Sequence, residues 1–475
     1  MIDRGMQAHR RQMVIGPAPK APSPHWLVEQ LACGRWLSRC PELRAKVVEG
    51  SDGVQWLLLG LAVQSDPRRP HPEVQLAEIV RDEVETACST WAGRYLLFGD
   101  GHMRTDATAQ LPCHWTAADP RGVWLSSSPA LVAEVAGTGA PSPGELEYGF
   151  GVSWIAPPRG RRSGIRRLLP SQSLDVAARR PRPRRLLLLD TDADTGSDPI
   201  RVLAGLLTEA VRRLPSTLPV HLGLSAGADS RAVLGAALGS GRAVDPFTRR
   251  AARMTVADRL LPRRLCSHFD LPHRELLPQA ADPERWMLAR RHTDDHVSAG
   301  DARPFVSAAR DSLVGVEIGG QGFGVGKALL RNLPAGIGNV QRTTELLLIE
   351  LGAGPEDPSR IGMSEWLDWV VAHPEPGLDW RDRFYLEQRM AGWQASKEQL
   401  YDLDSHERMS PLNSAAALTA LLRPDESERR DGSAQRELLR TLDLRLLSEP
   451  INPPGRSFPQ WRRLEHGLRV RWPGR

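Results

Sequence analysis

The sequence predicts an α/β protein in which a strand-rich, layered domain precedes a parallel α/β domain with a helical C-terminal part. Three observations predict this fold class. Residues 91–106 show a hairpin pattern, residues 220–238 show a buried strand, a tight turn and a helix, and strand and helix patterns then alternate along the chain. Such alternation favours a parallel sheet with ligands at the carboxyl ends of its strands.

The composition bounds the class of protein. The chain has 475 residues, of which 41% are hydrophobic and 25% charged, and its net charge is +5. These values are ordinary for a soluble protein of two or three domains. No apolar run approaches the roughly 20 residues that span a bilayer, and the first residues lack the apolar core of a signal peptide. We expect a cytoplasmic protein with no membrane partner and, because its 5 cysteines lack CxxC spacing, reduced thiols.

Positive charge is concentrated in three runs, residues 159–167, 179–185 and 456–475. Such runs can bind nucleic acid, but no aromatic-rich RNA-binding pattern accompanies them. We therefore favour solvated linkers over a nucleic-acid partner, with residues 456–475 as a basic tail. Residues 1–24 carry Pro, Gly and Arg without periodicity and are expected to form a flexible arm.

The first domain is expected to span residues 25–185. Its patterns follow one another as a strand at 54–63, a helix at 74–85, a hairpin at 91–106 that turns at 99–101, a strand at 123–128 and a helix at Pro129–Ala136. The arginine- and proline-rich stretch 178–185 fits a turn or linker to the next domain.

The second domain is expected to span residues 195–455. It opens with a helix, because Asp198 is a good N-cap and Pro199 fits the first helical position. After the strand, turn and helix of residues 220–238, where Gly239 is expected to stop the helix, further patterns indicate strands at 243–248 and 313–318 and helices at 255–269, 366–378 and 385–403.

The turn after residue 224 has the chemistry of an anion-binding loop. Gly227 lets the backbone approach a ligand, and the helix start directs unpaired N–H groups and a positive dipole end toward it. Phosphate is the natural ligand of such a site. Asp229 would repel bare phosphate unless a divalent cation bridged the two, so the loop predicts a nucleotide with Mg²⁺.

Four segments of the first domain carry a resemblance: WAGRYLLF (91–98), GDGHMRTDAT (99–108), VWLSSSPALVAEVAG (123–137) and GIRRLLPSQSL (164–174). Their order is similar to the glutaminase-type domain of asparagine synthetases and their relatives. That resemblance implies an N-terminal-nucleophile (Ntn) αββα sandwich. Working members carry a cysteine directly after the initiator methionine, where this chain has Ile2, and Cys33 lies too far inside. The implied domain is therefore degenerate and glutamine-independent, as in relatives that close β-lactams and lasso peptides. An unrelated β-sandwich is the alternative.

The loop Ser225-Ala-Gly-Ala-Asp-Ser230 resembles the family's pyrophosphatase (PP) loop Ser-Gly-Gly-x-Asp-Ser, with Ala226 in place of one glycine. The resemblance implies a HUP-like synthetase domain with ATP and Mg²⁺ as cofactors and Asp229 as metal ligand. The residues that it places at the cofactor are Leu224, Ser225, Gly227, Asp229, Ser230, Phe247, Thr248 and Gly320.

The loop at residues 319–327 keeps the family's glycines but lacks its magnesium-binding aspartate and its tyrosine. It offers Gln321 instead, with Glu317 buried in the strand before it. Magnesium would then depend on Asp229 and the phosphates, and Lys327 is expected to supply charge that a metal would otherwise supply. A dinucleotide fingerprint is rejected because the GxGxxG spacing fails.

Residues 406–413 resemble the family segment vEaRvPFLD, which implies that Glu407 positions or deprotonates an attacking amine. With the loop tyrosine missing, Tyr385, Tyr401 or His296 would complete a dyad. The alternative is that Glu407 only forms a salt bridge with an arginine. Arg456 is the candidate substitute for a C-terminal lysine that holds the transition state in adenylate-forming relatives.

His292 and His296 have the spacing of a metal pair on one helix face. We favour instead a polar loop facing substrate or a helix cap at Asp294, since a Mg-dependent nucleotide enzyme needs oxygen ligands.

Together these features predict a ligase that activates a carboxylate as an acyl-adenylate with release of pyrophosphate. An amine would then form an amide, lactam or isopeptide bond without glutamine. The partners are a small-molecule or peptide carboxylate and an amine, and a homodimer is left open. The alternatives are a non-catalytic nucleotide- or peptide-binding scaffold and, less favoured, an adenylating enzyme that acts on tRNA or passes sulfur.

Overall fold

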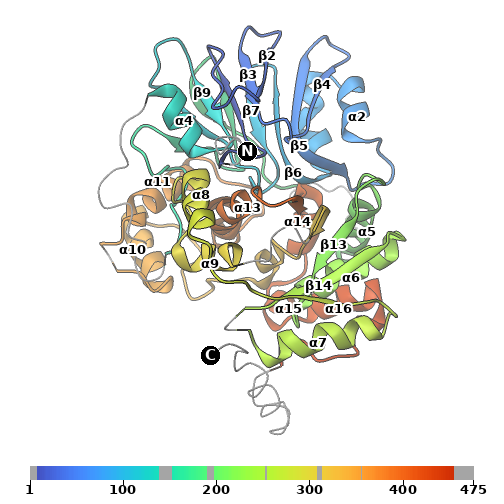
Figure 1. The fold of residues 1–475 in the computed structure, drawn as a ribbon. Coiled ribbons are helices and arrows are strands. Elements are labelled where there is room, and N and C mark those ends of the chain that lie inside the picture. The colour runs from blue at the N-terminus through green and yellow to red at the C-terminus, as the bar shows by residue number, and fades with distance from the viewer. Residues whose placement is uncertain are drawn as a thin grey trace.

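The computed structural model describes residues 8–137, 152–189, 197–251, 254–307, 313–354 and 356–453. It is a mixed α/β protein. Figure 1 shows two antiparallel sheets in the upper, N-terminal part and a parallel sheet flanked by helices in the lower part. The fold class expected from the alternating patterns is therefore confirmed at this level.

The first sheet has six strands in the order β10-β8-β9-β1-β3-β2. These strands are β1 (Met13–Gly16), β2 (Leu27–Gln30), β3 (Trp36–Arg39), β8 (His114–Thr116), β9 (Trp124–Ser126) and β10 (Arg166–Arg167). The flexible arm predicted for residues 1–24 is wrong for residues 8–24, because β1 pairs with β3 and β9 and is buried along its whole length. With both faces covered, β1 shows no alternation that sequence reading could detect.

The second sheet has six strands in the order β12-β11-β7-β6-β5-β4. These strands are β4 (Ala45–Glu49), β5 (Gln55–Gln64), β6 (Trp91–Gly99), β7 (His102–Thr105), β11 (Gln172–Asp175) and β12 (Arg180–Pro183). The β6–β7 hairpin is confirmed. The linker predicted at 178–185 is wrong, because β12 pairs with β11 as an edge strand. An edge tolerates Pro181 and Pro183, since one side of the strand needs no N–H donor.

The two sheets pack face to face, and helices cover their outer sides. The shared core contains Ile15 and Leu125 from the first sheet and Leu59, Leu96 and Met103 from the second. Helix α4 (Pro129–Ala136) covers the outer face of the first sheet. Helices α2 (Pro72–Glu78) and α3 (Val84–Cys88) cover the outer face of the second, beside a short helical turn, η1 (Arg81–Glu83).

The parallel sheet has five strands in the order β15-β14-β13-β16-β17. These strands are β13 (Val220–Gly223), β14 (Val244–Arg249), β15 (Arg274–Leu276), β16 (Gly315–Ile318) and β17 (His406–Met409). From β13 the chain proceeds to β14 on one side and later to β16 on the other. The strand order therefore reverses at β13, and such a switch point opens a crevice outside the carboxyl ends of the strands.

Helices α5 (Pro199–Arg212), α6 (Ala228–Ser240) and α7 (Val256–Ser267) accompany the first strands of this sheet. The predicted cap is confirmed, because the Asp198 side chain accepts a hydrogen bond from the Ile200 N–H and Pro199 opens α5. The predicted stop at Gly239 is wrong. Helix α6 continues to Ser240, and Gly241 ends it in the left-handed conformation at a φ of 72°.

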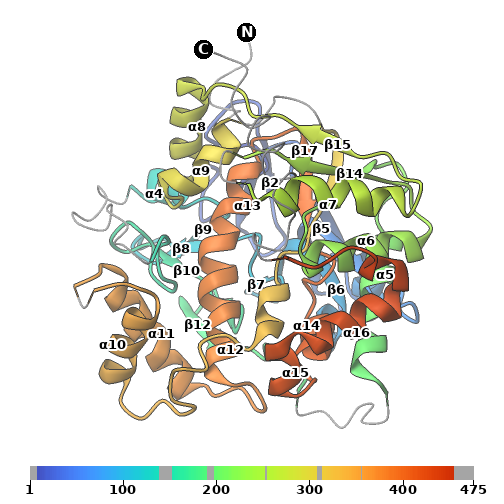
Figure 2. The ribbon, with the colours of Figure 1, turned by 90° about the horizontal axis from the view of Figure 1, so that it is seen from below.

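The remaining helices of the described residues come from the second half of the chain. They are α8 (Pro283–Thr293), α9 (Ala299–Val306), α10 (Val340–Glu350), α11 (Ser359–Ala372), α12 (Trp380–Phe384), the π-helical η3 (Tyr385–Gln394), α13 (Ala395–Tyr401), α14 (Ala415–Leu422), α15 (Glu426–Asp431), α16 (Ser433–Leu442) and the short turn η4 (Leu444–Leu447). In Figure 2, α12, η3 and α13 form one continuous rod through the middle of the molecule. Among the described residues, we find no helix with the length and apolarity needed to cross a membrane.

The basic run at residues 159–167 is not a solvated linker, so that interpretation is wrong. Arg159 and Arg166 both pair with Glu365, at 2.9 and 2.8 Å. Arg161 pairs with Asp295 at 2.7 Å and Arg162 with Asp294 at 2.6 Å. These carboxylates lie more than a hundred residues away along the chain, so the run joins the two domains. Local charge patterning could not reveal those partners.

Candidate functional site

Two loops meet at the switch point of the parallel sheet. The first follows β13 and leads into α6. The N-cap residue of α6 is Gly227, so no side chain at that position accepts a bond from the first N–H groups of the helix. The second follows β16 and contains the helical turn η2 (Phe323–Lys327). A Cβ on Gly320 would lie 2.8 Å from the Asp229 carbonyl carbon and 2.9 Å from its oxygen. Only glycine allows this approach, so Gly320 lies against the first turn of α6.

The first loop is held by its own side chains and by one carboxylate from α7. The Ser225 N–H donates to Ser230 Oγ at 3.1 Å, and the Gly227 N–H donates to Ser225 Oγ at 3.2 Å. The Ala226 N–H donates to Asp258 Oδ1 at 3.0 Å. Sequence reasoning did not give Asp258 this role. These bonds fix the loop shape and leave the start of α6 directed into the crevice, where its dipole favours an anion.

Arg231 ties the C-terminal segment to this loop. Its guanidinium is fully buried and donates to the carbonyls of Ala226 at 3.0 Å, Leu446 at 3.0 Å and Pro450 at 2.7 Å. The Asn452 N–H also donates to the Ala226 carbonyl, at 3.2 Å. Sequence reasoning missed Arg231 and Asn452, since backbone carbonyls as partners leave no pattern in the sequence. Asn452 is thereby placed beside Gly227, and it is a further polar side chain at the loop.

Asp229 lies at the mouth of the crevice in an ion pair. Lys327 Nζ is 2.8 Å from Asp229 Oδ2, and Gln435 Nε2 donates to Asp229 Oδ1 at 3.2 Å. Tyr385 is close by. Burial raises the pKa of its hydroxyl, and the Asp229 charge adds to that rise while Arg389 opposes it. A Cβ on Gly324 would lie 2.0 Å from Tyr385 Oη, so the hydroxyl fills the space beside the glycine loop.

The residues around Asp229 do not fit a protein-held Mg²⁺. Magnesium demands several oxygen ligands in near-octahedral geometry, whereas both carboxylate oxygens of Asp229 already accept bonds from Lys327 and Gln435. In the described parts of the chain, no group of three or more His, Cys, Asp and Glu side chains is placed to hold a metal ion. The predicted metal ligand is therefore observed as the partner of a lysine.

Glu317 is buried in β16, as expected, and is fully engaged. It pairs with His406 Nε2 at 3.0 Å, with Arg408 Nη2 at 3.2 Å and with Arg249. Burial disfavours its charge, but Arg408 and Arg249 outweigh that effect and hold the pKa of Glu317 below its usual range. This carboxylate is structural and does not substitute for the aspartate that the glycine loop lacks.

Glu407 faces the other side of the sheet. Its neighbour Arg408 pairs with Glu317, and successive side chains of a strand point to opposite faces. Arg44 from the first domain holds Glu407, with Nε 2.9 Å from Oε1. Glu407 therefore forms a salt bridge, which is the alternative that the sequence left open. In the described residues its partner is Arg44.

The three residues considered as dyad partners lie elsewhere. Tyr385 abuts Gly324, Tyr401 stacks under Arg408 with 3.9 Å between the guanidinium carbon and the ring centre, and His296 packs edge-on against His114. None of them is bonded to Glu407 in the described structure, so the predicted base is not assembled with the crevice.

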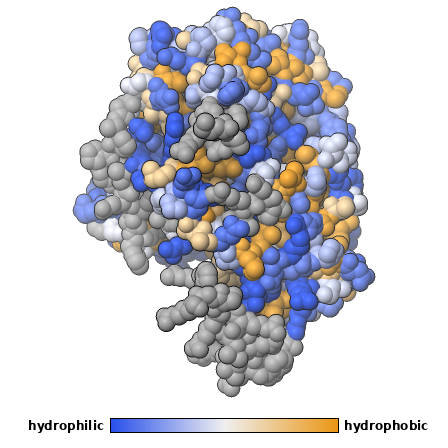
Figure 3. Space-filling model, viewed as in Figure 1, coloured by the Kyte–Doolittle hydropathy of each residue, from blue (hydrophilic) through white to orange (hydrophobic). Residues whose placement is uncertain are grey.

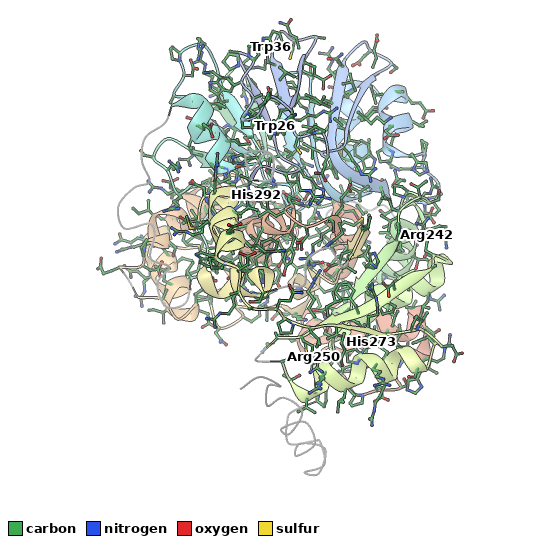
Figure 4. All side chains as sticks on the ribbon, in the orientation of Figure 1. Trp26, Trp36, Arg242, Arg250, His273 and His292 are labelled. Carbon is green, nitrogen blue, oxygen red and sulfur yellow. The ribbon has the colours of Figure 1, made fainter. Side chains whose placement is uncertain are left out.

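Strand β14 and the residues near it support the end of the sheet where the sequence predicts the nucleotide. Thr248 Oγ1 donates to the Leu224 carbonyl at 2.9 Å and lies 2.9 Å from His273 Nε2. Figure 4 shows His273 and Arg250 in this part of the parallel-sheet domain. Phe247 is fully buried, with the Arg249 guanidinium 5.0 Å from its ring centre. Leu224, Phe247 and Thr248 are thus all buried at the carboxyl end of the sheet.

The two histidines at 292 and 296 do not share a metal. His292 Nε2 lies 2.8 Å from the Gln399 carbonyl, and its Nδ1 faces the Ala8 carbonyl where the two domains meet (Figure 4). His296 Nδ1 lies 3.0 Å from the Thr293 carbonyl. Asp294 ends α8 as its C-cap, in agreement with the cap interpretation. Arg456, the candidate for the transition-state cation, lies outside the described residues.

No family model and no curated protein sequence matches the chain. Among solved structures, the allosteric regulatory enzyme of purine biosynthesis matches with 9% sequence identity over 74% of this chain and 74% of that chain, at a TM-score of 0.23. A match at this TM-score supports no conclusion on fold or activity. The argument for function therefore depends on the crevice itself.

Proposed function

We propose that this protein is an ATP-dependent, AMP-forming carbon–nitrogen ligase that acts without glutamine. A carboxylate oxygen of the substrate would attack the α-phosphorus of ATP, and pyrophosphate would leave with the electron pair of the broken P–O bond. An amine would then attack the acyl-adenylate and release AMP. The product would be an amide, lactam or isopeptide bond.

The observation that carries this proposal is the meeting of the start of α6 and the loop after β16 at the switch point, where the strand order predicts the crevice. The start of α6, without a side-chain cap, and the Lys327 ammonium both face it, and both favour the negative charge of a leaving pyrophosphate. Gly320 lets the second loop close on the first, and the Ser225 and Ser230 side chains hold the first loop in shape. Phosphate stabilisation of this kind is the main catalytic need of adenylation.

Independence from glutamine is supported by the first domain. Its layers of helix, sheet, sheet and helix support the Ntn sandwich that the sequence resemblance implies. Among the described cysteines only Cys33 is exposed, and it lies in the turn between β2 and β3. The domain would then serve as a packing partner, for example through the Arg44–Glu407 pair.

A second function, a non-catalytic nucleotide-binding scaffold, is favoured by one observation. The sequence resemblance gives chemical roles to two carboxylates, Asp229 and Glu407. Asp229 is held by Lys327, and Glu407 is held by Arg44. A scaffold would use the same crevice for binding and need neither carboxylate for a chemical step.

Pyrophosphate exchange into ATP with a panel of carboxylic acids, combined with calorimetric titration of ATP, separates these functions. Acid-dependent exchange that is lost in Ser225→Ala/Ser230→Ala would support the ligase. ATP binding without exchange for any acid would support the scaffold. If the protein binds no ATP, with or without Mg²⁺, both functions are ruled out.

A further inference from the structure

We infer that Lys327 is the cation that joins a bound polyphosphate to Asp229, so that the crevice takes a nucleoside polyphosphate free of divalent metal. This inference rests on the proposed ATP site and specifies the form of its ligand. It concerns the position next to the second residue of α6, where the sequence alone would place a magnesium ion.

The electrostatics of the α6 N-terminus require a cation at this position. A phosphate bound to the first N–H groups of α6 would lie beside the Asp229 carboxylate, and the two anions would repel each other. The Lys327 ammonium sits 2.8 Å from Asp229 Oδ2. It therefore occupies the place from which a bridging cation would act.

The Lys327 ammonium retains donors for a ligand. A lysine carries three N–H donors, and the structure assigns one of them to Asp229. The Lys327 side chain is 38% exposed, so its other donors reach the open side of the crevice. Two phosphate oxygens would satisfy these donors, with Asp229 anchoring the lysine in position.

The surroundings oppose a metal at the same place. Gln435 occupies the second oxygen of Asp229. A carboxylate at Gly324 would collide with Tyr385 Oη, which lies 2.0 Å from the position of a Cβ there. Glu317 is engaged by His406 and two arginines. Among the described residues these neighbours thus supply no second carboxylate, while the lysine supplies the charge.

Calorimetric titration of the full chain with ATP, once in excess EDTA and once in excess Mg²⁺, tests the inference. The wild type should bind ATP in EDTA at least as tightly as in Mg²⁺, because excess Mg²⁺ converts free ATP into its magnesium complex and so removes the form that the site takes. Lys327→Met should weaken binding in EDTA by about tenfold or more, the cost of one charge-assisted hydrogen bond. Mg²⁺ should restore much of that loss, because Asp229 is then free to contact the metal.

Two control variants make the test specific. Asp229→Asn/Lys327→Met should lose the rescue by Mg²⁺, since no carboxylate remains. Lys46→Met removes an equal charge from the exposed edge strand β4 and should behave as wild type. Thermal unfolding of each variant checks that it is folded.

The outcomes separate this inference from the proposed function. Wild-type binding that requires Mg²⁺, or a Lys327→Met variant that binds ATP in EDTA as wild type does, would overturn the inference and leave an ATP site in place. Absence of ATP binding in both conditions would overturn the proposed function and the inference with it. If Lys327 only forms a structural salt bridge, the Lys327→Met variant should bind ATP in EDTA as wild type does.

Discussion

Charged side chains form ion pairs in two regions of the molecule, the crevice and the interface between the domains. The two regions differ in how deeply these pairs are buried. In the crevice, the side chains of Asp229 and Lys327 are 30% and 38% exposed. At the interface, the Asp402 side chain is 3% exposed and accepts bonds from Arg94 and Gln12, at 2.8 Å each. A buried pair must stay paired, whereas a half-exposed pair can exchange partners with a ligand.

Breaking the buried pair should have the largest effect. Asp402→Ala leaves the Arg94 guanidinium buried without its anion and should lower the free energy of unfolding by about 3–5 kcal/mol. Urea unfolding measures the change. Asp229→Ala is the matched variant in the crevice and should cost about 1 kcal/mol or less, since its pair is solvent-exposed. Equal losses for the two variants would remove the distinction between the regions.

Acidification should also separate the regions, because two contacting pairs of buried histidines lie at the interface in the described residues. His9 stacks on His292, and His114 packs edge-on against His296. Burial, reinforced by His292, lowers the pKa of His9 to about 3, and burial lowers that of His296 to about 4. The pKa values of His114 and His292 are also lowered, mainly by burial.

The direction in which stability changes with pH follows from the pH at which each state binds protons. The unfolded chain takes up protons near pH 6.5 and the folded chain only at lower pH, so stability is full above 6.5 and falls as the pH is lowered. At pH 5 each of His9 and His296 should cost about 2 kcal/mol. Urea unfolding between pH 7.5 and 5 measures this slope, and His296→Gln should reduce it. An unchanged slope in that variant would contradict the assignment.

A smaller effect is expected where the second loop meets η3. Gly324→Ala would place a methyl group against Tyr385 Oη and should destabilise the protein by about 1–3 kcal/mol through overpacking. ATP affinity should fall with it, because the loop carries Lys327. Tyr385→Phe removes the hydroxyl, and Gly324→Ala/Tyr385→Phe should recover part of both losses. Chemical unfolding and ATP titration of the three variants provide the measurements.

The exposed apolar side chains of the described residues are scattered over the surface. On the face seen in Figure 3, hydrophobic residues form separate patches among hydrophilic ones in both domains. The exposed apolar side chains include Leu277, directly after β15, Met287 in α8 and Ile349 in α10. Scattered exposure of this kind is normal for a protein surface, so the crevice remains the region to which function is assigned.

Features set by neighbouring residues were predictable from the sequence. The cap at Asp198 and the β6–β7 hairpin each follow from patterns a few residues long. The parallel sheet followed from the alternation of such patterns.

Features set by distant partners were not predictable. The β1 strand has no alternation because both its faces are buried. The carbonyl contacts of Arg231 and the bond from Ala226 to Asp258 depend on segments brought together only by the fold. The direction of Glu407 depends on the register of β17 against β16, which places Arg408 opposite Glu317. Sequence likeness alone therefore could not tell whether that glutamate faced the crevice.

The smallest expected effect concerns Glu407 and tests its assignment most directly. Its partner Arg44 has a side chain that is 40% exposed, so Glu407→Gln should cost about 1 kcal/mol or less in stability. ATP affinity should be unchanged, since Glu407 lies on the face of the sheet opposite Glu317 and is held by the first domain. Arg44→Gln is the matched control and should give the same small loss, because each variant removes one side of the same pair. If Glu407→Gln abolished acid-dependent exchange while Arg44→Gln preserved it, the glutamate would have to leave Arg44 during turnover, and the contrast between a structural interface and a reactive crevice would no longer hold.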